Sequence, residues 1–296
     1  MPPPNKQQRI QHRQFLQREK MYESRFYRLF FGILARQYRS AAKIYPEPYI
    51  VNPNDYRAAI MKVYETCVPS EAEITWEYYV VPLTSERKDF FDDLAALLGF
   101  DIPSGEHVRL FRRLTAEWLD VNILTKITEI AKTTQRAIAK VIQKGLDEGL
   151  GEYEMAKYIR EQSKGEINQY RARMIARTEV VMSLNQGRHM AMVASNLEWT
   201  HKWVDTLDER TRTSHRIVSQ GRPIPLLEPY KVPIIKDKRI IGTEPARYPG
   251  DPTLSAGNVI NCRCTEVFEV VRDAAGRPKR KVISPKPISM AQLVEV

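Results

Sequence analysis

The feature that most constrains the fold is a helical pattern that begins near the N-terminus. The stretch from residue 6 to residue 45 contains no proline and a single glycine. Its aromatic and aliphatic side chains recur at intervals of seven and then four, which places them on one face of a helix. They are Phe15, Tyr22, Phe26, Phe30, Leu34 and Tyr38. The pattern predicts one long helix over residues 6–45.

Further helices are predicted downstream. Pro46, Pro48 and Pro53 end the first helix, because proline lacks an N–H and restricts the residue before it. Asn54 or Asp55 would then cap a helix that reaches about Glu65. The remaining predictions are a short strand over Ile74–Pro82 and helices over residues 85–98, 106–119, 122–145, 152–163 and 167–195.

After Trp199 the composition changes. Prolines and glycines become frequent, and β-branched residues gather in Lys231–Ile241 and Val259–Val271. The predicted fold class is therefore α+β, with a helix-rich N-terminal region and a small C-terminal α+β domain that carries a short antiparallel sheet. We expect a helical region over residues 1–145, the α+β domain over residues 146–271 and a basic tail over residues 272–296.

The net charge of +10 is concentrated at the two ends. Residues 1–40 hold nine Lys or Arg against two Glu, and residues 272–296 hold six against two acids. Such ends favour an anionic partner or a partner's acidic surface, whereas the simpler interpretation is solubility alone. The candidates for phosphate contact are Arg18, Arg25, Arg28 and Arg36 in the first helix and Lys279, Arg280 and Lys281 in the tail. For the first helix we favour packing on a partner over contact with DNA.

Several protein classes are disfavoured by the sequence. The sequence has no run of 18 apolar residues, which argues against a membrane span, and its first residues lack the apolar segment of a secretory signal. Three cysteines cannot build a disulfide framework, which favours a reducing compartment. Cys67 has no neighbouring Cys or His and is expected to be a small buried side chain.

The candidate site lies between Asp208 and Cys264. Asp208 is placed to cap a short helix that carries Arg212 and His215, and Cys262 and Cys264 follow later as a Cys-x-Cys pair. One interpretation is a structural zinc on His215, Cys262 and Cys264, which needs a fourth ligand from Asp208, His201 or water. A second is a cysteine nucleophile activated by histidine. The third, which we favour, is that these residues only hold the fold together.

Two polar residues of the predicted helix over residues 167–195 share its apolar stripe. Thr178 and Asn185 are seven positions apart, so they lie on the same side as the core-facing residues. Polar groups at such positions need hydrogen-bond partners, and we expect them to bind neighbouring backbone. His189 and His201 are assigned no function from the sequence.

The motifs of residues 145–271 resemble the phage Mu F-like minor head proteins, also called head morphogenesis proteins. The resemblance depends on an ordered set: Arg177, Thr178, Glu179 and Asn185, then Asp208 and Arg212 in KWVDTLDERTRTSH, then Gly221, then PGDP at Pro249–Pro252, and NCRC at Asn261–Cys264. Many relatives carry a Cys-x2-Cys where this chain has Arg212-Thr-Ser-His215, and a His-Pro before the Cys-x-Cys. Here His215, Cys262 and Cys264 are the possible ligands that remain.

The resemblance implies a non-enzymatic minor capsid protein, made in the host cytoplasm and located in the virion at the portal vertex or capsid interior. Its expected partners are the portal protein, the major capsid or scaffold protein and double-stranded DNA, with no membrane involved in assembly. DNA packaging or ejection is the process in which it would act. The alternatives are a Cys/His- or metal-dependent hydrolase or nuclease acting at His215, Cys262 and Cys264, and a host-side nucleic-acid-binding module.

Overall fold

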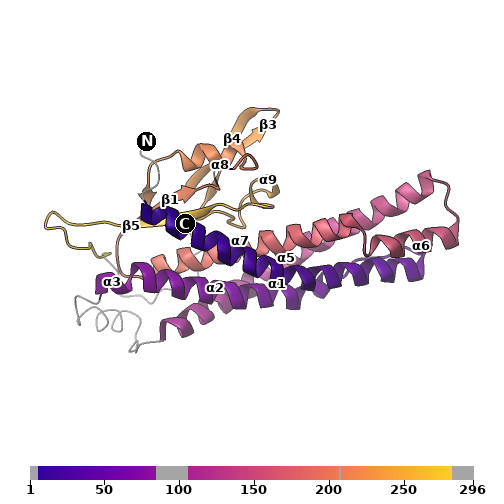
Figure 1. The fold of residues 1–296 in the computed structure, drawn as a ribbon, viewed down its shortest axis with the longest axis horizontal. Coiled ribbons are helices and arrows are strands. Elements are labelled where there is room, and N and C mark those ends of the chain that lie inside the picture. The colour runs from indigo at the N-terminus through magenta and orange to yellow at the C-terminus, as the bar shows by residue number, and fades with distance from the viewer. Residues whose placement is uncertain (1–5, 85–105, 207, 282–296) are drawn as a thin grey trace.

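The computed structural model describes residues 6–84, 106–206 and 208–281. Four long helices lie side by side: α1 (Lys6–Ile44), α2 (Arg57–Tyr79), α5 (Glu106–Asp147) and α7 (Glu166–Ala194). A small part with strands rests on one side of this helical layer, near the start of α1 (Figure 1). The predicted α+β class, with helices first and short antiparallel sheets after, is confirmed.

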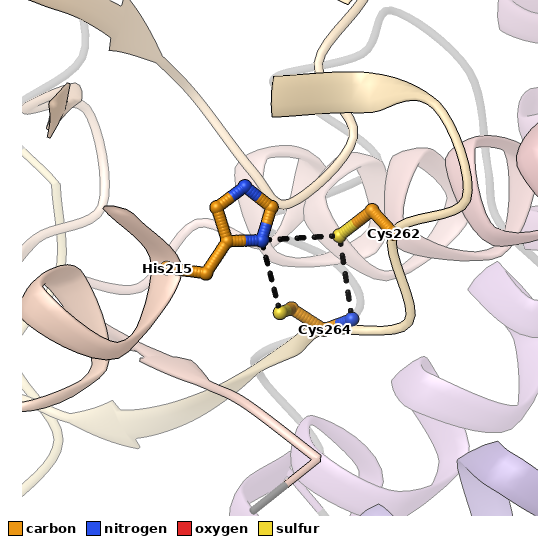
Figure 2. Close-up of side chains that lie close together, drawn as sticks. All are labelled: His215, Cys262 and Cys264. Atoms are coloured by element: carbon orange, nitrogen blue, oxygen red, sulfur yellow. Dashed lines mark hydrogen bonds between the residues drawn. The ribbon is translucent and has the colours of Figure 1, made fainter. Parts of the chain in front are cut away.

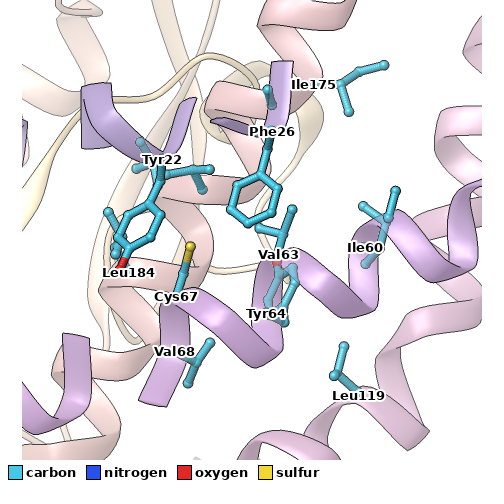
Figure 3. Packing of buried hydrophobic residues seen from close by; sticks show 14 of the residues in the cluster. Tyr22, Phe26, Ile60, Val63, Tyr64, Cys67, Val68, Leu119, Ile175 and Leu184 are labelled. Carbon is cyan, nitrogen blue, oxygen red and sulfur yellow. The ribbon is translucent and has the colours of Figure 1, made fainter. Parts of the chain in front are cut away.

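The aromatic stripe of α1 faces the interior of its own chain. Phe15, Phe26, Phe30 and Leu34 have at most 1% of their surface exposed. They pack with side chains of α2 and α7, as Figure 3 shows around Phe26, Val63 and Cys67. The expectation that this stripe docks on a partner protein is therefore wrong, because the other helices of the same chain already cover it. Burial of Cys67 is as predicted.

The second helix differs most from its prediction. A 3-10 turn, η1 (Pro53–Tyr56), precedes it, and the side chain of Asn52 caps this turn by accepting a hydrogen bond from the Asn54 N–H at 3.0 Å. The helix α2 then continues through Pro69 to Tyr79, and α3 (Val81–Thr84) follows. The predicted end near Glu65 and the predicted strand over Ile74–Pro82 are both wrong.

The physical reason is a close crossing of α2 and α7. A Cβ on Gly187 of α7 would lie 2.4 Å from the Val68 carbonyl oxygen of α2, so the two backbones are in direct contact. Packing of this kind outweighs the lost hydrogen bond at Pro69 and the β-propensity of the residues near Ile74.

The third long helix, α5, is continuous. We predicted two helices over residues 106–119 and 122–145, but α5 runs unbroken because the sequence between Glu106 and Lys144 has no proline and no glycine. The helices α6 (Glu152–Gln162) and α7 agree with prediction. The predicted helix over residues 85–98 lies outside the described residues, as does the tail beyond Lys281.

Two small antiparallel sheets form the C-terminal part. The first has the strand order β2 (Ile224–Pro225), β1 (Trp199–Val204), β5 (Thr265–Val270), and the second is the hairpin of β3 (Tyr230–Lys236) and β4 (Arg239–Ala246). The hairpin turns at Asp237 and Lys238, which both have positive φ. The short helices α8 (Thr213–Ser219) and α9 (Ala256–Val259) lie in the connections.

One hydrophobic core joins the predicted N-terminal region to the C-terminal part. It runs from Phe15 through α2, α5 and α7 to Trp199 and Phe268. The boundary proposed at residues 145 and 146 falls within α5, so it does not separate two cores. A smaller cluster around Trp203 and Tyr230 includes Cys262 and Cys264. None of the described helices combines the length and apolar character that a bilayer crossing requires.

Candidate functional site

His215, Cys262 and Cys264 meet in the small C-terminal core. His215 is on α8, Cys262 follows α9, and Cys264 directly precedes β5. The imidazole Nδ1 lies 3.3 Å from the Cys264 sulfur and 3.6 Å from the Cys262 sulfur, and the Cys264 N–H donates to the Cys262 sulfur at 3.4 Å (Figure 2). All three residues are buried. The fold thus brings together the three residues that the sequence proposed as ligands.

The donor atoms match a zinc site in kind and spacing, but a structural zinc ion needs a fourth ligand. Zn–S and Zn–N bonds of about 2.3 and 2.05 Å at a tetrahedral angle place nitrogen and sulfur about 3.6 Å apart. The two proposed protein donors for the fourth position are engaged elsewhere: Asp208 binds Arg263, and His201 binds Glu266. Among the described residues the group of potential ligands here comprises these three.

Hydrogen bonds polarise the two cysteines differently. The Cys264 thiol and the His215 imidazole lower the pKa of Cys262, while the neighbouring Cys262 and burial raise the pKa of Cys264. Of the two sulfurs, Cys262 is therefore the one whose thiolate form its neighbours favour. Nδ1 of His215 and the two sulfurs are partnered through sulfur–imidazole and sulfur–amide contacts, while the buried Nε2 of His215 has no hydrogen-bond partner.

Asn185 and Thr178 connect α7 to the segment that holds the cysteines. The Asn185 amide donates to the carbonyl oxygens of Pro249 and Cys264, both at 2.9 Å, and accepts from the Thr265 hydroxyl at 2.8 Å. The Thr178 hydroxyl donates within its own helix and accepts from the Asn261 N–H at 2.9 Å. Asn261 has a φ of +62°, so this contact holds a conformation that few residue types adopt readily.

The neighbouring motif residues form ion pairs between helices. Arg177 makes a bidentate contact with Glu23 of α1 at 2.8 and 3.0 Å, and donates to the Asn261 side chain at 2.9 Å. Glu179 accepts from Lys126 of α5 at 3.0 Å and from Tyr64 of α2 at 3.1 Å. The Arg-Thr-Glu motif thus contacts three other helices and the Cys-x-Cys segment.

The remaining motif residues order the loop before α8. Arg212, not Asp208, is the N-cap of that helix, and its guanidinium donates to the Ile260 carbonyl. Asp208 accepts from Arg263 at 2.6 Å instead. Although partial burial acts in the opposite direction, Arg263 lowers the pKa of Asp208 to about 2. Gly221 closes the helix, with its N–H bound to the Val218 carbonyl.

The residues nominated for phosphate contact divide into two groups. Arg25, Arg28 and Arg36 are exposed on α1. Arg18 instead forms a bidentate contact with the buried Glu71 at 2.6 and 2.7 Å. Lys281 donates to the carbonyl oxygens of Val193 and Ser195 at the end of α7, where a helix leaves its carbonyls without partners. The expectation that Lys281 contacts phosphate from the tail is therefore wrong. In the tail, Lys279 pairs with Glu198, and Arg280 is exposed and forms a β-bridge with Leu197.

Two features of the structure have no recognisable signal in the sequence. His189, His201 and Glu266 come together in a second buried group, although in sequence they belong to a helix and two separate strands. A groove of about 550 Å³ also opens between α5 and α7 on one side and residues 245–260 on the other. It is lined mainly by apolar side chains such as Trp118, Ile175 and Leu254. His215, Cys262 and Cys264 do not line it.

These observations define an α+β protein whose motif residues fasten a small sheet-containing part to a layer of long helices. Residues 136–267 match the family model described as Phage Mu protein F like protein. This match supports a phage Mu F-like head morphogenesis protein, a family whose members are structural components of phage heads. Comparison with curated proteins and with solved structures gives no significant match.

Proposed function

We propose that this protein is a minor head protein that binds the portal vertex during head assembly. The match to a head morphogenesis family supports a place in the head. The observation that carries the portal assignment is the outer face of α1, made of Met21, Arg25, Arg28, Leu29, Arg36 and Arg39. These residues follow one side of the helix and are all exposed, with Met21 at 56% and Leu29 at 36%.

The composition of this outer face favours a protein partner. Arginine and methionine are enriched at protein–protein interfaces, where apolar side chains are buried and guanidinium groups find carboxylates. Arginines interleaved with Met21 and Leu29 fit an acidic protein surface better than phosphate backbone alone, which needs no apolar contact. The aromatic stripe on the opposite side of α1 fixes the helix in the core, so the outer face is presented rigidly.

The test is co-purification with the portal protein of the same phage. Deletion of the N-terminal helices is not informative, because they share a core with the family region. The informative variant reverses Arg25, Arg28 and Arg36 to Glu. Its matched control reverses the exposed Lys231, Lys236 and Arg239 of the hairpin to Glu, which changes the net charge equally. We expect the first variant to lose the portal complex and the second to retain it; equal binding by both would refute the proposed docking face.

A second candidate function, contact with packaged DNA, is favoured by the same exposed arginines. A chain that neutralises phosphates with Arg25, Arg28 and Arg36 should lose affinity as salt rises, with a log–log slope near 0.9 per phosphate. Reversal of the three should abolish binding to double-stranded DNA, measured by fluorescence anisotropy at several salt concentrations. Absence of binding by the unaltered protein at low salt would remove this candidate.

We propose that the His215, Cys262 and Cys264 cluster supports the fold and performs no catalysis. A nucleophile must meet its substrate, and here both sulfurs are buried and outside the groove. Nδ1 of His215 contacts both sulfurs, and these contacts support a role in holding the fold together that needs no metal. Cys262→Ser should therefore lower stability, measured by urea unfolding. A hydrolase or nuclease activity that is lost in His215→Ala while the fold is retained would instead establish the enzyme alternative.

A further inference from the structure

A second buried cluster lies where α7 crosses the three-stranded sheet. It consists of His189 on α7, His201 on β1 and Glu266 on β5. The strand register pairs His201 with Phe268 and Trp203 with Glu266, so His201 and Glu266 lie on one face of the sheet, two positions apart. His201 and Glu266 are fully buried, and 7% of His189 is exposed.

The hydrogen bonds of His201 determine which of its ring nitrogens carries the hydrogen and which one is free to bind a metal ion. Its Nε2 lies 3.1 Å from the carbonyl oxygen of Glu228, so this nitrogen carries the hydrogen that it donates. In the neutral ring, Nδ1 then presents a lone pair, and it lies 2.9 Å from a carboxylate oxygen (Oε2) of Glu266. A ring whose far nitrogen donates to a backbone carbonyl is the usual arrangement of a metal-binding histidine.

Two other atoms of the cluster form an ion-pair contact with each other but no well-aligned hydrogen bond. They are Nδ1 of His189 and Oε1 of Glu266, which are both buried and lie 3.3 Å apart. If His189 carries its proton on Nδ1, this contact is a long and poorly aligned hydrogen bond; if the proton is on Nε2, both atoms are left unsatisfied, and a buried unpaired polar atom is costly. In the cysteine cluster, Nδ1 of His215 already has two sulfur partners, and the unpartnered buried atom is Nε2 of the same ring.

We propose that His189, His201 and Glu266 form a binding site for a divalent transition-metal ion, bound through the two Nδ1 atoms and both carboxylate oxygens of Glu266, which makes four donor atoms. With metal–ligand bonds of about 2.1 Å, the two N···O distances correspond to angles at the metal of about 90° and about 105°. Both angles are acceptable for zinc or iron(II), and two imidazoles with one carboxylate suit these ions better than calcium or magnesium.

Such an ion would join three separate elements. It would connect α7 to β1 and β5 at the junction between the helical layer and the sheet (Figure 1). The ion would therefore act as a fold-stabilising clamp, since the metal binds the folded arrangement and not the unfolded chain. The inference does not depend on the proposed portal function.

The experiment uses the full-length protein, treated with a chelator and then reconstituted with zinc or, without oxygen, with iron(II). Bound metal is measured after removal of the excess. The test variant is Glu266→Gln, and the control is Glu179→Gln, which alters another buried carboxylate that already has Lys126 and Tyr64 as partners. We expect the unaltered protein and the Glu179→Gln control to retain one equivalent, and Glu266→Gln to retain none.

Cobalt(II) distinguishes this site from the cysteine cluster. Cobalt bound to thiolate shows an intense sulfur-to-metal charge-transfer band, whereas cobalt held by imidazole and carboxylate does not. We expect the spectrum without that band, and a melting temperature of the unaltered protein that rises with zinc but not with magnesium. These two readouts remain valid even if Glu266→Gln fails to fold. No retained metal, equal retention by Glu266→Gln, or a thiolate band that accounts for all bound cobalt would overturn the proposal.

Discussion

Asn185→Ala should be among the most destabilising single substitutions in this protein. Asn185 is completely buried, and its amide supplies the hydrogen bonds to the Pro249 and Cys264 carbonyls, both at 2.9 Å. Truncation leaves both carbonyls without a donor inside the core, at about 1–3 kcal/mol each. The Thr265 hydroxyl also loses its acceptor, but it can rotate. The expected loss is about 3–5 kcal/mol, a large part of the roughly 5–15 kcal/mol that stabilises a typical protein.

The measurement is the free energy of unfolding in urea, with Asn122→Ala as the control. Asn122 also donates to a carbonyl, that of Trp118, but within one helix and at a partly exposed position. Its loss should cost about 1 kcal/mol or less, because water can replace the donor. If the two variants lose equal stability, Asn185 does not hold the sheet-containing part to α7. A double-mutant cycle with Thr265→Val gives a second test. If the losses of the two variants simply add, Asn185 and Thr265 are not coupled, which would also contradict the proposed role of Asn185.

Three further predictions concern the helical layer. Burial, and then the neighbouring Glu23, raise the pKa of Glu19 to about 7 from 4.5, so stability should fall as pH rises from about 4.5 through 7. Glu19→Gln should remove this dependence and add about 2 kcal/mol at pH 8; parallel pH curves for the two proteins in urea unfolding would contradict it. Gly187→Ala should cost about 2–4 kcal/mol in the same assay, because its Cβ would overlap the Val68 carbonyl oxygen; a loss below 1 kcal/mol would mean that α2 and α7 separate easily. Lys281→Met should cost about 1–2 kcal/mol by leaving carbonyls at the end of α7 without donors, and an unchanged melting temperature would show that water replaces the ammonium.

The tertiary structure changes the interpretation of the basic and aromatic residues of α1. From the sequence, Arg18 and Arg25 are equivalent, since both lie beside the aromatic stripe. In the structure α2 presents the buried Glu71 to Arg18, while Arg25 has its side chain exposed. The same applies to Lys281, whose side chain turns back to the end of α7. Local sequence carries no information on such partners, because they are 53 or more positions away.

The sequence by itself determined the helices α1, α6 and α7, the change to strands after Trp199, and the three residues that the fold brings together as the cysteine cluster. Periodicity and helix-breaking residues act locally, so α1, α6 and α7 could be placed to within a residue or two. Motif order was sufficient to propose the family. The continuation of α2 past Pro69 could not be predicted, because contact with Gly187 of α7 compensates for the proline only in the folded chain.

Only the tertiary structure decided how the polar residues are partnered. Asn185 and Thr178 were expected to bind backbone nearby, whereas their distant partners belong to segments 64 and 83 residues away. His189, His201 and Glu266 have no recognisable spacing, because three separate elements bring them together. Secondary structure follows from interactions between residues a few positions apart, but a buried site is built by long-range packing. Its geometry therefore becomes visible only when the helical layer and the sheet are assembled.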